Sequence, residues 1–261
     1  MVLKTLPAIF VMSALSACVH SAEAPTPSSS AWVTIFDGDS LSGWTPKIVG
    51  ETLGQDSAGI FRVENGELHV SYQNVPAFEN RFGHLFFEEE LSDYRLRFDY
   101  RFFETQAPGG PAWAFMNSGV MVHAQAPDTM RKDQAFPVSV EAQLLGTSAA
   151  TPERTTANIC TPGTHIVLQG SLTKQHCINS ETLAAAADDW ISFELEVRSG
   201  DYMRLSIEGQ EAFFLSQPEF DPADPDVSRL GLNGPVEQGF FALQAESHPV
   251  AFRNIELMRL D

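Results

Sequence analysis

The chain has 261 residues, and its 34 Asp and Glu against 16 Lys and Arg give a net charge of −18 at pH 7. So acidic a protein is a poor partner for nucleic acid or for an anionic lipid surface, because like charges repel. The sequence has no Gly-x-Ser-x-Gly elbow, no His-Glu-x-x-His, no P-loop and no dinucleotide-binding fingerprint. Serine hydrolase, zinc protease, kinase and Rossmann dehydrogenase functions therefore lose support.

The N-terminus predicts export. Residues 1–17 carry a positive charge at Lys4, then an apolar run, then Leu-Ser-Ala directly before Cys18, which is the form of a secretory signal. It resembles a bacterial lipoprotein signal, whose cysteine is lipidated. We therefore expect a lipid anchor at Cys18 in the cell envelope, and Val19 favours the outer membrane or periplasm. The alternative is an ordinary signal that is cut further on, after Ser-Ala-Glu-Ala.

Residues 18–31 form a Pro/Ser-rich segment that predicts a flexible tether. No later stretch has the roughly 18 apolar residues that a membrane span needs. The remainder, 32–261, is of a size that suits a single all-β domain. Membrane contact is expected through the lipid anchor only.

Several stretches alternate apolar and polar residues with a period of two, as strands do. They are 94–102, 117–125, 136–146, 191–197 and 203–209. Turn sequences such as Glu-Asn-Gly-Glu and Arg-Ser-Gly-Asp separate strands. Apart from the signal, only 180–190 has helical propensity. The pattern predicts two packed antiparallel sheets, an all-β sandwich.

The strand at 136–146 raises the question of function. One face carries Val138, Val140, Ala142 and Leu144, and the other carries Ser139, Glu141 and Gln143. The polar face thus holds a single carboxylate. In the strand at 117–125 the alternation places Val120, Val122 and Ala124 on one face, and Asn117, Gly119, Met121, His123 and Gln125 on the other. The strand at 94–102 likewise turns Arg101 to its polar face.

Two cysteines remain once Cys18 is assigned to lipid. In an exported protein, Cys160 and Cys177 are expected to form one disulfide, whose loop closure is worth about 3 kcal/mol on the chain-entropy model. A metal site is the alternative, because His165 and His176 lie in the same loop. Zinc ligands usually come in closely spaced pairs, and the loop has no second pair, so the disulfide is favoured.

Several motifs occur together in one order along the chain. They are Thr-Ile-Phe-Asp-Gly-Asp-Ser-Leu-Ser-Gly-Trp (34–44), Phe-Arg-Val-Glu-Asn-Gly-Glu-Leu-His-Val (61–70), the strands at 94–102, 117–125 and 139–146, and Val-Ala-Phe-Arg-Asn-Ile-Glu-Leu (250–257). This series resembles the 3-keto-disaccharide hydrolase domain family, formerly a domain of unknown function. The resemblance implies a concanavalin A-like jelly-roll sandwich. The sequence departs from the common family pattern at two motifs. His123-Ala124 replace a frequent Arg-Gly, and Ala-Glu-Ser-His-Pro-Val (245–250) replaces a frequent Asp-His-Gly.

A single glutamate suits a sugar oxidised at C3, which is the substrate class that the resemblance implies. Conventional glycosidases need two carboxylates. A sugar oxidised at C3 has an acidic proton on C2, and its glycosidic oxygen lies β to the ketone, so one base can start an elimination that hydration completes. That route also needs a group that stabilises the enolate oxygen and a proton donor for the leaving group.

Candidate residues can be assigned to each role. Glu141 is the expected base. His123, Arg101 or a bound cation could polarise the ketone, and His248 or Glu246 could protonate the leaving group. The expected substrate-binding residues are Gln143, Gln125, Asn117 and Trp113. No cofactor is certain, although a Glu/His/Gln cluster could hold a divalent ion as Lewis acid.

Two other functions fit the same fold. A non-catalytic, lectin-like module of the cell envelope would bind sugars without turnover, and Trp113 in its Gly-Pro loop is the best aromatic candidate. A structural envelope protein would have no deep polar pocket. For the hydrolase and for the lectin-like module the expected partner is a carbohydrate. For the hydrolase this carbohydrate is an oxidised oligosaccharide or glycoside.

Overall fold

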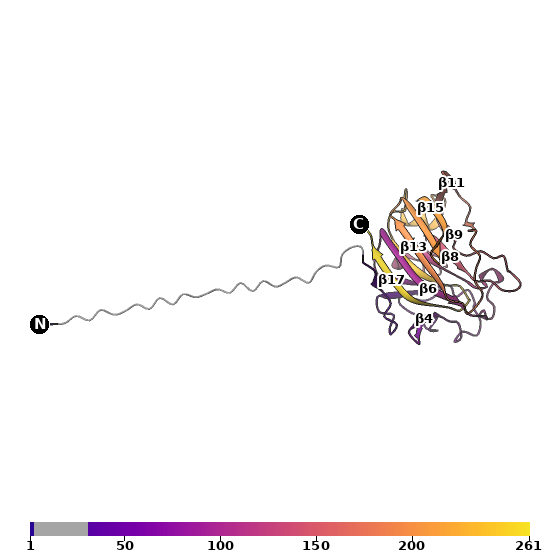
Figure 1. Cartoon of the computed structure of the whole chain (residues 1–261), viewed down its shortest axis with the longest axis horizontal. Helices are drawn as coiled ribbons and strands as arrows, with labels where there is room; N and C mark the ends of the chain where they lie inside the picture. The colour runs from indigo at the N-terminus through magenta and orange to yellow at the C-terminus, as the bar shows by residue number, and fades with distance from the viewer. Residues whose placement is uncertain (3–30) are drawn as a thin grey trace.

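The computed structural model describes residues 1–2 and 31–261 of the chain. Residues 3–30, with Cys18 and most of the predicted signal and tether, lie outside the described residues. The described chain forms a two-sheet antiparallel β-sandwich, with the strands of both sheets stacked in layers (Figure 1). The expected all-β, lectin-like sandwich is thus confirmed.

The larger sheet has ten strands. Nine follow the order β11-β10-β15-β14-β13-β6-β17-β4-β3, and β1 pairs with β17. Their bounds are β1 Val33–Thr34, β3 Phe61–Glu64, β4 Glu67–Val70, β6 Asp93–Phe102, β10 Thr164–Leu168, β11 Ser171–Thr173, β13 Ile191–Arg198, β14 Tyr202–Ile207, β15 Gln210–Phe220 and β17 Val250–Arg259.

The smaller sheet has seven strands in the order β12-β9-β8-β7-β16-β5-β2. Their bounds are β2 Trp44–Ile48, β5 Gly83–Phe87, β7 Asn117–Ala124, β8 Val140–Leu145, β9 Asn158–Cys160, β12 Cys177–Ile178 and β16 Phe240–Ala245. Every strand ladder in the two sheets is antiparallel. The central strands β8, β7 and β16 lie side by side, and they position the site described below.

The core lies between the two sheets and is built by strand alternation. Because successive side chains of a strand point to opposite faces, every second residue enters the core. From the larger sheet these include Tyr94, Leu96, Phe98, Tyr100 and Phe102 of β6. From the smaller sheet they include Val120, Val122, Val140, Ala142, Leu144, Phe241, Leu243 and Ala245. The apolar face predicted for the strand at 136–146 is confirmed.

The outer face of the seven-stranded sheet is partly covered. The segment between β7 and β8 contains the 3-10 turn η2 (Pro127–Thr129). It lays Met130 on a small apolar cluster with Phe86, Met121, Ala124 and Ala242. Another 3-10 turn, η1 (Ala112–Ala114), comes just before β7 in the chain. A polar cavity lies on this same outer face.

Helix is scarce in the described residues. The stretch 180–190, where we expected helical propensity, instead makes isolated bridges, at Thr155↔Leu183 and Thr147↔Ala186. Pairing with neighbouring segments overrides a weak local preference. The α-helix that does form is α1 (Pro225–Leu230), capped by Asp224, whose side chain accepts from two backbone N–H groups. Within residues 1–2 and 31–261, no helix combines the length and apolarity needed to cross a bilayer.

Candidate active site

A cavity of ≈ 230 Å³ lies on the outer face of the seven-stranded sheet, and we call it the carboxyl cavity. Its lining comes from β7, β8, β9 and β12 and from the loops around them. The lining residues are Trp113, Asn117, Phe136, Glu141, Gln143, Cys160, Pro162, His176, Cys177 and Glu246. Five of the nine residues predicted for catalysis or substrate binding are among them: Glu141, Glu246, Asn117, Gln143 and Trp113.

Glu141 reaches the cavity because of its place on β8. Its neighbours Val140 and Ala142 enter the core, so Glu141 points outward. Its side chain lies over Gly119 of β7, where an added Cβ would stand 2.6 Å from the Glu141 Oε1. A glycine at this position therefore makes the room that the carboxyl group occupies.

Burial changes the acidity of Glu141. The residue is only 6% exposed, and desolvation of the charged form raises the pKa of its carboxyl group to about 7, although a hydrogen bond from the side chain of Gln244 acts in the opposite direction. A carboxylate with a pKa near neutrality is a good general base at physiological pH.

Glu246 supplies a second carboxyl group to the same cavity. It follows β16, is 3% exposed, and its Oε2 is buried with no hydrogen-bond partner in the described residues. Burial, and then the negative charge of Glu141, raise the pKa of Glu246 well above its ordinary value. Two neighbouring buried carboxyl groups cannot easily both ionise, so the pair holds a proton at neutral pH.

Amide side chains complete the polar lining. Asn117 is 2% exposed, and its Oδ1 is buried without a hydrogen-bond partner in the described part of the chain. Gln143 accepts a hydrogen bond from Asn158 Nδ2 at 3.1 Å through its Oε1. That bond orients the Gln143 amide. The Asn117 Oδ1 can therefore accept from a bound hydroxyl group, and the NH2 groups of both amides can donate to a bound hydroxyl or carbonyl oxygen.

Aromatic residues form one wall. Trp113 is 56% exposed, and its ring stacks on Phe82 with a centroid distance of 6.1 Å and an interplanar angle of 10°. Arg154 holds the loop in place, because its guanidinium donates to the backbone carbonyls of Phe115, Gly146 and Trp113. An exposed, fixed tryptophan beside a polar cavity is suited to stacking on a sugar ring.

A disulfide forms another part of the lining. Cys160 and Cys177 are bonded, as predicted, and they are paired across β9 and β12. Cys160 is also the cross-strand neighbour of Glu141. The cysteines are thus not metal ligands. Within the described residues, no group of three or more His, Cys, Asp and Glu side chains is placed to hold a metal ion.

His123 does not join the site, because a β-bulge changes the face to which it points. The ladder between β16 and β7 shifts register between Phe240 and Ala242, and His123 has a φ of 47°. Its ring lies 6.0 Å from that of Tyr94 in the core. The prediction that His123 shares a face with Met121 was wrong, and Ala124 takes the outer position instead.

Glycine makes this bulge feasible. A Cβ at Gly239 would stand 2.5 Å from the carbonyl carbon of His123. The imidazole Nε2 of His123 lies 3.1 Å from the Ser92 carbonyl oxygen, and burial lowers the pKa of the ring. His123 is therefore a neutral structural residue whose ring points into the core, on the opposite face of the sheet from Glu141.

Two further candidates, Arg101 and Gln125, also lie elsewhere. Arg101 is on the outer face of the ten-stranded sheet, where it pairs with Glu67 and its guanidinium lies over the Trp190 ring. The whole sandwich separates it from Glu141. Gln125 is occupied in bonds to Gln134 and to the backbone of Val138. It fixes the segment between β7 and β8.

His248 is buried beside the carboxyl cavity and does not line it. Its Nε2 donates to the Phe103 carbonyl oxygen at 2.6 Å, and its ring packs 5.0 Å from that of Phe115. Burial lowers the pKa of the imidazole, so the ring is neutral. The structure assigns His248 a packing position, and of the two candidate proton donors Glu246 alone lines the cavity.

The sequence did not point to Phe136 as a wall residue or to Arg154 as the anchor of the Trp113 loop. It named Glu246 as a candidate but offered no second carboxylate on the strand of Glu141. The two glutamates meet only through the order β8-β7-β16. A useful signal was present in Gly119, since a glycine inside a strand often marks close approach by another group.

The fold is similar to several solved structures. A protein from Parabacteroides distasonis ATCC 8503, provisionally described as a glycosyl hydrolase, has a TM-score of 0.53 at 14% identity, over 88% of this chain and 100% of that chain. Another with the same description, from the same organism, has a TM-score of 0.51 at 17% identity, over 88% and 94%. A galectin-like protein of unknown function from Bacillus subtilis has a TM-score of 0.50 at 12% identity, over 88% and 94%.

At these identities the likeness shows the fold alone. The chain has a lectin-type two-sheet sandwich fold. It belongs to the 3-keto-alpha-glucoside-1,2-lyase-like domain family, whose sequence pattern matches residues 31–258. No curated protein matches the chain in sequence.

Proposed function

We propose that the protein cleaves 3-keto-glycosides by elimination followed by hydration. The observation that carries this proposal is the buried pair of Glu141 and Glu246 in one cavity, with the pKa of Glu141 at about 7. Such a pair can provide one carboxylate as base and one neutral carboxyl group as acid. Membership of the family supports the oxidised sugar as substrate.

The first half of the reaction breaks the glycosidic bond. Glu141 takes the proton from C2, and the electron pair forms an enolate with the C3 oxygen. The enolate re-forms the ketone and makes the C1=C2 double bond as the C1–O bond breaks, and the leaving oxygen takes the proton of Glu246. The amides of Asn117 and Gln143 are the donors in the cavity that can stabilise the enolate oxygen.

The second half restores the sugar. Water adds its oxygen to C1 and loses one proton to the Glu246 carboxylate, while C2 receives the proton that Glu141 holds. Both glutamates thereby return to their starting protonation states. The sum is hydrolysis. An unoxidised sugar has no acidic C2 proton, so the pair has no comparable route with it.

Conventional glycoside hydrolysis is the second candidate, because the cavity contains two carboxyl groups. That mechanism places them on either side of the scissile bond, with separate roles. Here both arise from the outer face of one sheet, and the charge of Glu141 acts on the pKa of Glu246. Close coupling of this kind favours a proton-sharing pair and hence elimination.

The experiment compares a 3-keto-glucoside with the matching glucoside, each with a chromogenic leaving group, in H₂O and in D₂O. Elimination with hydration predicts release from the keto-sugar only, with deuterium at C2 of the product. Glu141→Gln should abolish release, while Glu211→Gln, a change at an exposed ion pair with Arg204, should leave it intact.

Other outcomes would contradict the proposal. Release from the unoxidised glucoside, without deuterium at C2, would indicate conventional hydrolysis. Sugar binding without turnover of either substrate would indicate a lectin-like module. An EDTA-treated sample with and without added divalent ions decides whether a metal takes part.

We also propose, from the sequence alone, that the chain is exported and anchored to the envelope through a lipid on Cys18. Labelling cells with a fatty-acid analogue should mark the protein. Cys18→Ala should remove the label and release the protein from the membrane fraction, and an unlabelled wild-type protein would contradict the proposal.

A further inference from the structure

A line of polar residues crosses the outer face of the seven-stranded sheet, and we call it the polar row. It consists of directly opposite residues of β2, β5, β16, β7, β8 and β9, in the order Lys47, His84, Gln244, Gly119, Gln143 and Asn158. The pairing of Gln244 with Gly119 follows from the register Leu243↔Val120, carried one residue further. Gly119 has no side chain, and the carboxyl group of Glu141 lies over it. The polar row therefore passes directly beneath Glu141.

We propose that Gln244 is a positioning residue that selects Glu141, in preference to Glu246, as the base, and that His84 holds the Gln244 amide in the orientation that this requires. The inference rests on the proposed function, since it concerns the same pair of glutamates. Neither Gln244 nor His84 lines the carboxyl cavity, so both act through Glu141 and do not touch the substrate.

Gln244 is a buried donor to Glu141. It is 0% exposed, and its Nε2 lies 3.9 Å from the sulfur of Met121, the residue directly opposite Glu141 in the ladder of β7 and β8. Burial raises the pKa of Glu141, and the hydrogen bond from the Gln244 side chain opposes this effect. A hydrogen bond to the charged form of a carboxyl group favours that form. The Ser118 hydroxyl donates to the Gln244 carbonyl oxygen at 2.8 Å and holds the backbone in place.

Glu246 has a different environment. Its Oε2 is buried and has no hydrogen-bond partner in the part of the chain that the structure describes. Burial, and then the charge of Glu141, raise the pKa of Glu246. Gln244 thus supports the charged form of Glu141, and Glu246 is the member of the pair that keeps its proton.

The effect depends on which way the Gln244 amide points. With the amide reversed, its carbonyl oxygen would face the Glu141 carboxylate and repel it. The Oε1 of Gln244 is buried without a partner among residues 31–261, and so is the Nε2 of the opposite residue, His84. Buried polar atoms are usually paired. A hydrogen bond from His84 Nε2 to Gln244 Oε1, direct or through a bound water, satisfies both atoms and fixes the amide.

His84 is suited to this task because its charge does not change. It is 1% exposed, and burial, together with the positive charge of Lys47, lowers the pKa of its imidazole to about 3. Lys47 is held at the end of the polar row, where its Nζ donates to the carbonyl oxygens of Ile48 and Lys132. The ring therefore stays neutral, with one N–H, while the two glutamates titrate.

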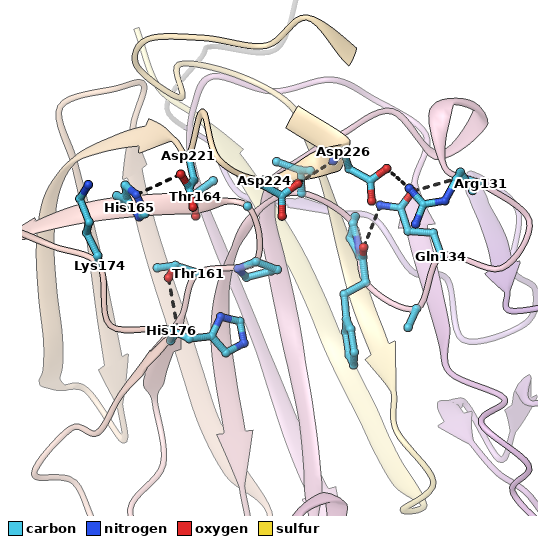
Figure 2. A pocket seen from close by; sticks show the side chains of 16 residues that line it. Arg131, Gln134, Thr161, Thr164, His165, Lys174, His176, Asp221, Asp224 and Asp226 are labelled. Atoms are coloured by element: carbon cyan, nitrogen blue, oxygen red, sulfur yellow. Dashed lines mark hydrogen bonds and ion pairs between the residues drawn. The ribbon is translucent and has the colours of Figure 1, made fainter. Parts of the chain in front are cut away.

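The segment between β7 and β8 covers His84. The Phe136 ring lies 6.1 Å from the His84 ring, at an interplanar angle of 75°, and Gln134 Nε2 donates to the Phe136 carbonyl oxygen at 2.9 Å. Arg131 pairs with Asp226 of helix α1, and Figure 2 shows this pair with Gln134 beside it, at the edge of a neighbouring cavity. A hydrogen bond that is shielded from water in this way is strong.

The test follows the ionisation of Glu141 itself, by ¹³C NMR of the glutamate carboxyl groups in the full chain. A Glu246→Gln background leaves Glu141 as the member of the pair that titrates. Gln244→Met conserves the volume of the side chain and removes its donor. It should raise the pKa of Glu141 by about one unit or more, as expected for a lost hydrogen bond to a charged group. Gln210→Met, at an exposed residue of β15, is the matched control and should change nothing.

Activity gives a second readout in the chain that retains Glu246. Gln244→Met should move the rising limb of the pH profile of kcat/KM for the keto-glycoside upwards by a similar amount. Damage to packing alone would lower the rate without moving the limb. Gln244→Asn, which withdraws the amide by one methylene group, should shift the limb in the same direction.

Two variants separate the hydrogen bond of His84 from its packing. His84→Leu removes the ring and the donor, whereas His84→Gln removes the ring and keeps an N–H at a similar distance from the backbone. The leucine variant should raise the pKa of Glu141, and the glutamine variant should leave it close to the wild-type value. Equal effects of the two would assign His84 a packing role and overturn its part of the inference.

An unchanged or lower pKa of Glu141 in folded Gln244→Met would overturn the whole inference. If that variant does not fold, Gln244→Asn and His84→Leu decide the question in the same titration. The titration needs no turnover, so it separates the two proposals. A raised pKa in a protein that cleaves neither sugar would reject the proposed function and still establish that Gln244 favours the ionisation of Glu141.

Discussion

Glu141 on β8 and Glu246 after β16 enter the same cavity across the intervening strand β7, and the charge of Glu141 raises the pKa of Glu246. This relationship couples the ionisation of the two carboxyl groups. Because the pair is buried, ionising either carboxyl group lowers the free energy of unfolding, and the proposed reaction requires one of the two to lose its proton.

The pH dependence of activity should report the pair. Catalysis needs Glu141 ionised and Glu246 protonated, so kcat/KM for the keto-glycoside should rise with pH through about 7, following the pKa of Glu141, and fall at higher pH as Glu246 ionises. Glu246→Gln should remove the falling limb and lower kcat by about 10²-fold or more. A flat profile between pH 5 and 8 would contradict the assignment.

Stability should fall as the pH rises through the same range. Both carboxyl groups have folded-state pKa values above their ordinary ones, so the folded state favours their protonated forms. Their full contribution is present below the ordinary value near 4.5. The contribution of Glu141 is lost as pH rises through about 7, and that of Glu246 is lost as pH rises through its own raised pKa, at up to about 1.4 kcal/mol per pH unit for each group. Urea unfolding at pH 5 and pH 8 measures this loss.

Glu246→Gln is the variant that isolates the effect. At pH 8 it should be more stable than the wild type, and the difference should shrink towards pH 5. The exposed Glu211→Gln should show no such trend. A wild-type protein that became more stable between pH 5 and pH 8 would be evidence against the buried pair.

Gly119→Ala should disable Glu141 without unfolding the sheet. The new Cβ would lie 2.6 Å from Glu141 Oε1 and 3.0 Å from its Cγ, so the carboxyl group must move. Alanine is compatible with strand backbone at this position, so the melting temperature should change little while kcat falls about tenfold or more. Normal activity in this variant would show that the position of Glu141 is not critical.

Loss of the disulfide should affect both stability and activity. Cys160 and Cys177 close a loop with a sequence separation of 17, so the double variant Cys160→Ser/Cys177→Ser should lose about 3 kcal/mol, or about 6–12 °C in melting temperature. Because both residues line the carboxyl cavity, activity at 25 °C should fall as well. Full activity of the folded double variant would mean that the wall needs no cross-link.

Trp113→Ala should weaken substrate binding. Its ring is 56% exposed at the cavity, so its removal costs little stability but takes away a stacking surface worth about 1 kcal/mol. KM should rise about fivefold, with kcat less affected. Trp32→Ala, on the opposite sheet beside Arg97, is a matched control. A large drop in melting temperature with unchanged KM would assign Trp113 a structural role.

Local patterns in the sequence predicted much of this molecule. Alternation with a period of two placed Val140, Ala142 and Leu144 in the core and Glu141 and Gln143 outside it, since the direction of a side chain in a strand follows from its neighbours along the chain. The Cys160–Cys177 disulfide and the family were also predictable. The same rule failed at His123, where one extra residue in β7 reverses the alternation, and at 180–190, where long-range pairing replaced a weak helical tendency.

The sequence by itself determined the all-β class, the face of each regular strand, the disulfide and Glu141 as the candidate base. Only the tertiary structure decided which outward residues meet. It joined Glu246 to Glu141 through the order of β8, β7 and β16, and it placed Arg101 on the far sheet and His123 in the core. The physical reason is that alternation is a local property of one strand, whereas strand order, register and bulges depend on pairing between residues that lie far apart in the chain.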